Sequence, residues 1–144
     1  MLNKRAVWAG LSAGVIGHIM QGAAAYFFFD RFYLANADLV RDANWATGFY
    51  YLFLNMIVGT VIAHVSQYLQ ATRPEPDWKA GIKAGLLIWA ASSPIWVIRR
   101  QIILKLPNWL ILEIPVDLVI YTVMGALAGF LVGRGIIEKE RISR

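Results

Sequence analysis

Apolar residues along this chain gather in long runs that are separated by short polar segments. Two of these runs, residues 6–29 and 46–69, contain no Asp, Glu, Lys or Arg. Because about 20 helical residues cross a hydrocarbon layer of about 30 Å, each run is long enough to span a bilayer with some tilt. We interpret residues 6–29 as an uncleaved first span, since the run is longer than the apolar part of a signal peptide.

Two further runs, residues 78–98 and 110–133, carry charged residues only near their starts. In the third run these are Lys79 and Lys83, whose long side chains can bring the ammonium groups back to the lipid headgroups. Few residues remain for a soluble domain. The pattern therefore predicts an all-α integral membrane protein, with four transmembrane helices packed in a bundle and a single membrane domain over residues 1–144.

A tryptophan stands at the start of each run. The indole ring is apolar while its N–H seeks a polar partner, so tryptophan collects at membrane interfaces. Composition agrees with this interpretation, because charged residues make up 16% of the chain against about 25% in an average soluble domain. The four residues are Trp8, Trp45, Trp78 and Trp109.

Basic residues are divided unevenly between the two sides of the predicted bundle. Four spans place both termini and the link between the second and third spans on one side, which holds nine basic residues, whereas the other side holds five. The positive-inside bias then predicts cytoplasmic termini, and we expect the inner membrane of a prokaryote. Since the net charge of +5 comes from residues at span ends, we expect membrane lipid as a partner and no nucleic acid.

The two halves of the chain resemble each other. The first and third spans open with the same two-glycine spacing at an offset of 71 residues, and Gly59 roughly matches Gly125 in the second and fourth spans. We predict a duplicated two-helix hairpin, with repeats over residues 1–70 and 78–140. The alternative is chance similarity between spans rich in alanine and glycine.

Both outer connectors are expected to form short amphipathic helices on the membrane surface. Residues 30–44 gather apolar side chains on one helical face, and residues 99–112 alternate basic with apolar residues as far as Pro107. The link over residues 71–77 contains two prolines and predicts a tight turn.

Glycines four residues apart leave bare backbone on one face of a helix. In lipid, close approach of backbones carries much of the packing between helices. The sequence leaves two interpretations open: packing inside one bundle, which we favour because three of the four spans need such faces, and an interface between copies in a homo-oligomer. The glycines concerned are Gly10, Gly14, Gly81, Gly85, Gly125 and Gly129.

A polar cluster marks the start of the fourth span. Glu113, Asp117 and Tyr121 recur every four residues and therefore share one helix face. An unpaired carboxylate in a membrane is costly, so Arg99 and Arg100, at the end of the third span, are its candidate partners. The cluster is either a structural ion pair, which we favour, or an outward-facing pocket for a cation, a proton or a charged headgroup.

Polar residues at membrane depth predict an interior hydrogen-bond network of His18, Gln21 and Asn55. His18 and His64 also raise the possibility of haem b held by two histidines. Helical rise places the two imidazoles about 10 Å apart in depth, which disfavours a shared iron. We therefore predict no cofactor, and no metal site because no metal-ligand spacing is present.

No catalytic motif is present. The chain has no cysteine, and it contains no Ser-His-Asp order and no Gly-rich phosphate loop, so no feature requires an enzyme. We expect a non-catalytic accessory, assembly or self-associating subunit, whose partners are further copies of itself or a larger membrane complex. The alternatives are a small-solute or ion transporter with an outward-facing polar site, and a membrane enzyme that handles lipid or quinone.

Overall fold

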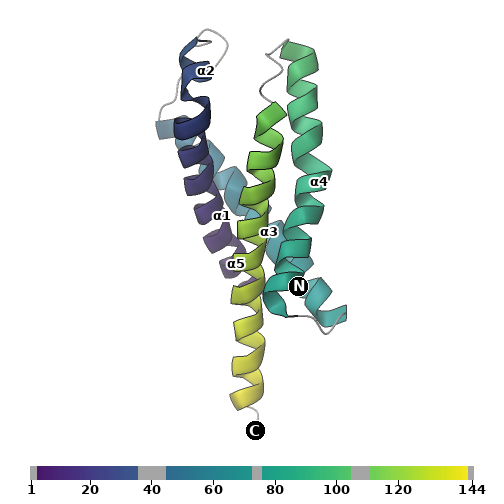
Figure 1. The fold of residues 1–144 in the computed structure, drawn as a ribbon. Coiled ribbons are helices and arrows are strands. Elements are labelled where there is room, and N and C mark those ends of the chain that lie inside the picture. The colour runs from purple at the N-terminus through teal and green to yellow at the C-terminus, as the bar shows by residue number, and fades with distance from the viewer. Residues whose placement is uncertain (1–2, 36–44, 73–75, 105–110, 143–144) are drawn as a thin grey trace.

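The protein is all-helical (Figure 1). A computed structural model describes residues 3–35, 45–72, 76–104 and 111–142, without the side chains of residues 32–33, 35, 99–104 and 134–142. In chain order the elements are α1 (Lys4–Ala24), the π-helical turn η1 (Ala25–Phe29), α2 (Asp30–Ala35), α3 (Trp45–Thr72), α4 (Asp77–Leu104) and α5 (Glu113–Ile142).

Four helical stretches are long and apolar enough to cross a membrane, which confirms the four helices expected from the sequence. The first stretch begins two residues before its apolar run, and the second ends three residues after its run. In both cases polar residues continue the helix beyond the apolar segment. The stretches are Lys4–Phe29, Trp45–Thr72, Asp77–Ile98 and Glu113–Gly133.

Local polar contacts set where two of the helices begin. The Asn3 side chain caps α1 by accepting a hydrogen bond of 3.0 Å from the backbone N–H of Arg5. The first backbone hydrogen bonds of α4 end on the Pro76 carbonyl, which accepts from the N–H groups of Lys79 at 2.8 Å and Ala80 at 3.2 Å. Both helices that open a hairpin therefore have a defined first turn.

The third span ends at Ile98 as predicted, but the structure corrects the connector that follows it. α4 continues through Pro94 as far as Leu104, so residues 99–104 extend this helix and do not start a separate surface helix. A proline removes one hydrogen bond of the helix, and no further glycine or proline follows it inside α4. The remainder of that connector, residues 105–110, and residues 36–44 of the first connector lie outside the described residues.

The helices form two hairpins, α1 with α3 and α4 with α5 (Figure 1). α3 and α5 each contact all three other long helices, whereas the described parts of α1 and α4 do not touch each other. We call the end that contains Lys4, Thr72 and Asp77 the terminal end of the bundle. The opposite end, which contains Phe29 and Trp45, is the connector end.

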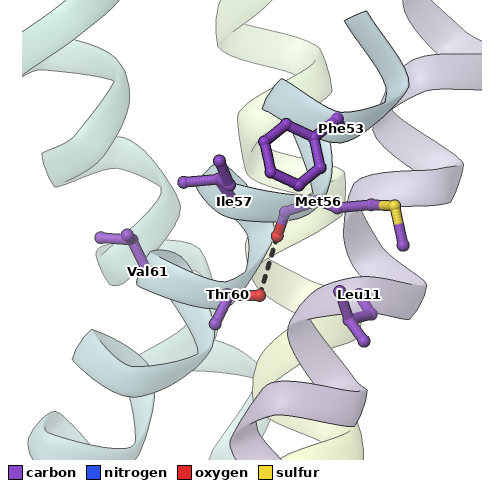
Figure 2. A pocket seen from close by; sticks show the side chains of 6 residues that line it. All are labelled: Leu11, Phe53, Met56, Ile57, Thr60 and Val61. Carbon is purple, nitrogen blue, oxygen red and sulfur yellow. Dashed lines mark hydrogen bonds between the residues drawn. The ribbon is translucent and has the colours of Figure 1, made fainter. Parts of the chain in front are cut away.

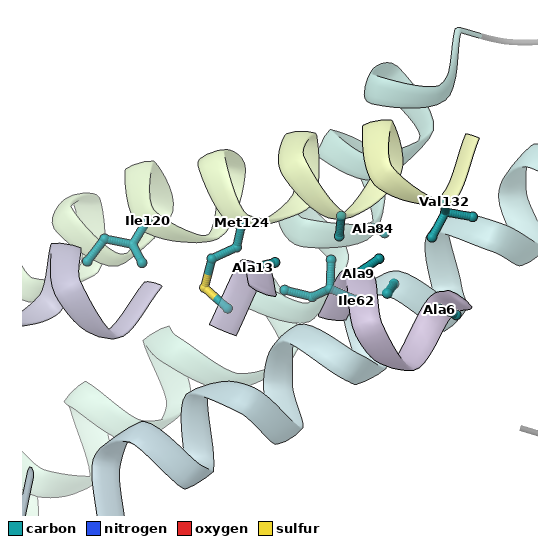
Figure 3. Close-up of a cluster of buried hydrophobic side chains, with 10 residues drawn as sticks. Ala6, Ala9, Ala13, Ile62, Ala84, Ile120, Met124 and Val132 are labelled. Carbon is teal, nitrogen blue, oxygen red and sulfur yellow. The ribbon is translucent and has the colours of Figure 1, made fainter. Parts of the chain in front are cut away.

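Small side chains dominate the core that the two hairpins share (Figure 3). One face of α5 supplies a residue every four positions, and short side chains from the other helices fill the space opposite. Most of the core lies in the half of the bundle nearer the terminal end. Its members are Ala6, Ala9 and Ala13 of α1, Ile62 and Ala63 of α3, Ala84 of α4, and Ile120, Met124, Ala128 and Val132 of α5.

Candidate functional site

Bare backbone brings α1 directly against α3. A Cβ atom added to Gly10 would overlap the backbone of Gly59 and Thr60, and one added to Gly14 would overlap the backbone of Asn55. Conversely, a Cβ on Gly59 would strike the carbonyl oxygen of Gly10. The two helices therefore pack at a distance that only glycine permits.

The same kind of contact joins α4 to α5. A Cβ on Gly81 would overlap the carbonyl oxygen of Gly125, and one on Gly85 would overlap the carbonyl oxygen of Tyr121. A Cβ on Gly129 would likewise overlap the backbone of Asp77 and Gly81. Each glycine that the sequence marked for packing thus faces a helix of the same chain.

A hydrogen bond also links α1 and α3, on the connector-end side of Gly10 and Gly14. The amide of Asn55 donates to the Gln21 side-chain oxygen at 2.8 Å and to the Tyr51 carbonyl at 2.9 Å. Asn55 is only 6% exposed, so both donor protons are used inside the protein. His18 is half-buried, and among the described residues no hydrogen bond connects it to Gln21 or Asn55.

Serines of α4 meet the polar face of α5. The Ser93 hydroxyl donates a hydrogen bond of 2.5 Å to the Asp117 carboxylate, and the Ser92 hydroxyl donates one of 2.7 Å to the Ile88 carbonyl of its own helix. Ser93 is buried, while Asp117 and Tyr121 are half-buried. The sequence analysis expected arginine partners for Asp117 and missed Ser93, although a serine pair just before Pro94 at membrane depth was the available signal.

The predicted arginine partners lie further along α4. Arg99 and Arg100 follow Ser93 by six and seven residues, which is about 9–10 Å of helix, toward the connector end. Their side chains lie outside the described part of the structure, so the ion pair with Asp117 or Glu113 remains a prediction. A further tie between the same helices is present nearby, because the Trp89 indole donates to the Ile114 carbonyl at 3.1 Å.

Gln70 joins three helices near the terminal end. Its amide nitrogen lies 3.1 Å from the Gly129 carbonyl of α5, 3.3 Å from the Asp77 carbonyl of α4 and 3.3 Å from the Ser66 hydroxyl of its own helix. The sequence analysis did not single out Gln70. A polar side chain two residues before the end of an apolar helix was the only sign of this role.

Two buried acceptor atoms have no hydrogen-bond partner among the described residues: the Gln70 side-chain oxygen and Nε2 of His64. The other ring nitrogen of His64, Nδ1, lies 2.8 Å from the Thr60 carbonyl. A carbonyl oxygen only accepts, so Nδ1 carries the proton and Nε2 presents a lone pair.

His18 and His64 are far apart along the first hairpin. Gly10 lies opposite Gly59 and Thr60, and Gly14 lies opposite Asn55, so position 64 on α3 is level with positions 5–6 on α1. His18 is therefore about 19 Å from the level of His64 along the hairpin. Within one chain these imidazoles do not meet on one iron.

An apolar groove of about 260 Å³ runs along the outer face of the first hairpin (Figure 2). Its one hydroxyl belongs to Thr60, which donates to the Met56 carbonyl at 2.8 Å, so no polar group of the lining is left to recognise a polar ligand. The groove therefore fits hydrocarbon. Its lining is Leu11, Phe53, Met56, Ile57, Thr60 and Val61.

Comparison of the chain with protein-family models, with curated proteins and with solved structures finds no match. Within the described residues no three His, Asp or Glu side chains are grouped to hold a metal ion. The fold and the contacts alone therefore define the class: an all-α four-helix bundle in which each of the four helices has the length and apolar character needed to cross a membrane.

Proposed function

We propose that this protein is an integral membrane protein that acts as a non-catalytic accessory, assembly or self-associating subunit. The proposal rests on polar side chains at membrane depth that form hydrogen bonds to neighbouring helices. Asn55 ties α3 to α1, Ser93 ties α4 to α5, and Gln70 ties α3 to both α4 and α5. Side chains engaged in this way hold helices together, which is their commonest role in membrane bundles.

Large exposed apolar side chains support the same proposal. Around the connector end of the first hairpin Phe27 is 75% exposed, Trp45 is 79% exposed and Phe49 is 63% exposed. On a soluble protein such a surface would drive association, whereas in a bilayer it faces lipid or a partner helix. The groove beside Ile57 is of the same apolar kind.

Assembly is testable because the chain has no cysteine. Single cysteines at the exposed positions Ile57, Leu87 and Val119 report on three different helices. We expect oxidation in native membranes to join at least one of them to a second copy or to a partner protein. A protein that stays monomeric with all three cysteines, and that purifies alone in mild detergent, would contradict the proposal.

The proposal includes an orientation, with both termini cytoplasmic and the inner membrane of a prokaryote as the location. It is supported by nine basic residues at the terminal end against five at the connector end. A membrane-impermeant maleimide added to intact cells should label Ala46→Cys at the connector end and leave Asn3→Cys unlabelled. Labelling of Asn3→Cys alone would reverse the orientation.

We also propose that the two hairpins are repeats of one unit. Gly59 packs on Gly10 of the first hairpin as Gly125 packs on Gly81 of the second, with offsets of 71 residues for the opening helices and 66 for the returning ones. An experimental structure should superpose the hairpins in this register by rotation about an axis along the membrane normal. If the hairpins superpose only in another register, the proposed repeat is wrong.

A transporter of ions or small solutes is the second candidate. It is favoured by the buried, unpartnered acceptors His64 Nε2 and Gln70 Oε1, which are groups that take water or a cation. In proteoliposomes we expect no flux of protons, sodium or potassium above empty vesicles. A flux that disappears in both His64→Gln and Asp117→Asn would instead establish the transporter.

A further inference from the structure

The net charge of the protein is confined to one end of the bundle. When each charged residue is assigned to the helix ends that flank it in the sequence, the terminal end has nine basic and four acidic residues, which leaves +5. The connector end has five of each, so its charges cancel. The nine basic residues are Lys4, Arg5, Arg73, Lys79, Lys83, Arg134, Lys139, Arg141 and Arg144, and the four acidic ones are Glu75, Asp77, Glu138 and Glu140.

Exposed lysine and tryptophan side chains occur together at this end on two helices. On α1, Lys4 is exposed and lies one turn before Trp8, which is 71% exposed, so both occupy the same face. On α4, the ammonium group of Lys79 lies 5.5 Å from the centre of the Trp78 ring, and Lys83 is exposed one turn further on. Because α1 and α4 do not touch, the two groups lie on separate flanks.

The carboxylate in the first turn of α4 packs against α5. The Asp77 carboxylate lies against the backbone of α5, where a Cβ on Gly133 would overlap it. Asp77 is thus directed at the neighbouring helix, while Lys79 is exposed beside the Trp78 ring. A cationic and aromatic surface is left at the level where the helices leave the hydrocarbon layer.

We propose that these two lysine–tryptophan pairs bind the headgroups of acidic phospholipids, so that the terminal end docks on an anionic leaflet. An ammonium group attracts the phosphate, while the indole ring settles among the headgroups beside it. The tryptophans favour lipid over an acidic soluble protein, because they stand at the first turns of apolar helices. This inference rests on the membrane insertion proposed above.

The test compares phosphatidylglycerol with phosphatidylcholine as ligands of the purified full chain, with bound lipids counted by native mass spectrometry. We expect phosphatidylglycerol to bind preferentially at low salt. Each of Lys4→Gln and Lys79→Gln should lower that preference about fivefold, as expected for the loss of one surface cation. Arg31→Gln removes an exposed cation at the connector end and is the matched control, for which the preference should be unchanged.

Two results would overturn the inference: equal binding of both lipids by the unaltered protein, or a loss in Arg31→Gln as large as in Lys79→Gln. A separate measurement distinguishes failure of the membrane proposal. Protein reconstituted in vesicles of phosphatidylcholine alone should float with them and resist extraction by carbonate at high pH. A protein that does not float refutes membrane insertion itself, whereas one that floats without discriminating between lipids refutes only the headgroup sites.

Discussion

At the scale of single residues, the closest contacts between helices occur where a side chain is missing. Gly59 and Gly125 each rest on a carbonyl oxygen of the facing helix, and the backbone there has no room for even one methyl group. Gly22 is different, because a Cβ atom added to it would meet nothing within 4 Å. Position in the fold, and not residue type, therefore decides what a glycine contributes.

We predict opposite effects for the same substitution at two glycines. Gly125→Ala should destabilise the protein by about 1–3 kcal/mol, because the new methyl group overlaps backbone that cannot move without separating α4 from α5. Gly22→Ala is the control and should be neutral or stabilising by up to about 1 kcal/mol, since alanine is the better helix former. Unfolding in mild detergent measures both, and equal losses would contradict the contact.

We expect the hydrogen bond between Asn55 and Gln21 to give a small but measurable coupling free energy. A double-mutant cycle with Asn55→Ala and Gln21→Ala should give a coupling energy of about 0.6 kcal/mol and no more than about 1.7 kcal/mol, the range found for polar contacts between membrane helices. Additive effects would mean that the two amides do not meet in the folded protein.

At the scale of elements, polar ties differ between the two hairpins. α4 and α5 remain joined toward the connector end by Ser93 with Asp117 and by Trp89 with the Ile114 carbonyl. α1 and α3 are tied in their middle by Asn55, beyond which α3 is largely exposed. At the terminal end, the Gln70 side chain connects the first hairpin to the second.

Gln70→Leu should therefore loosen the junction between the hairpins. We expect a loss of about 1–2 kcal/mol, since contacts to the Asp77 and Gly129 carbonyls disappear together. Hydrogen exchange at the first turn of α4 should also accelerate. Gln67→Leu on the same helix is the control, because no described hydrogen bond joins Gln67 to another helix. An equal loss of stability in Gln67→Leu would mean that replacing any glutamine with leucine has this effect, whatever its contacts.

At the scale of the whole molecule, the shared core is placed asymmetrically. Its members come from all four long helices (Figure 3), and most of them lie in the half nearer the terminal end. α1 and α4 draw apart toward the connector end, with α5 between them (Figure 1). The bundle is therefore packed most densely at one end.

This asymmetry predicts a gradient of local stability. In detergent, amides within residues 6–17 and 120–132 should exchange at least about tenfold more slowly than those within residues 18–28 and 46–54, because opening the packed half breaks contacts among all four helices. Peptide-resolved hydrogen exchange measures the difference. A uniform rate along α1 would contradict the asymmetric core.

Part of the fold was accessible from the sequence because it depends on local properties. The length and apolar character of each run predicted four helices. The predicted end of the third span at residue 98 is confirmed, whereas the separate surface helix expected from residue 99 onward was wrong, because α4 continues without interruption to Leu104.

The sequence predicted only some of the polar contacts between helices. Asn55 and Gln21 were predicted to share a network, but Ser93 as the partner of Asp117 and the role of Gln70 were not. Gln70 and Gly129 are 59 residues apart, and their contact depends on how three helices rotate about their axes. No short segment of sequence contains that information.

The sequence by itself thus determined that the chain forms four apolar helices, and it located the glycines on their faces. Only the tertiary structure decided which faces meet, and placed the shared core in one half of the bundle. The physical reason is that helix formation and apolar length are properties of each segment, whereas register and rotation result from packing all the segments together.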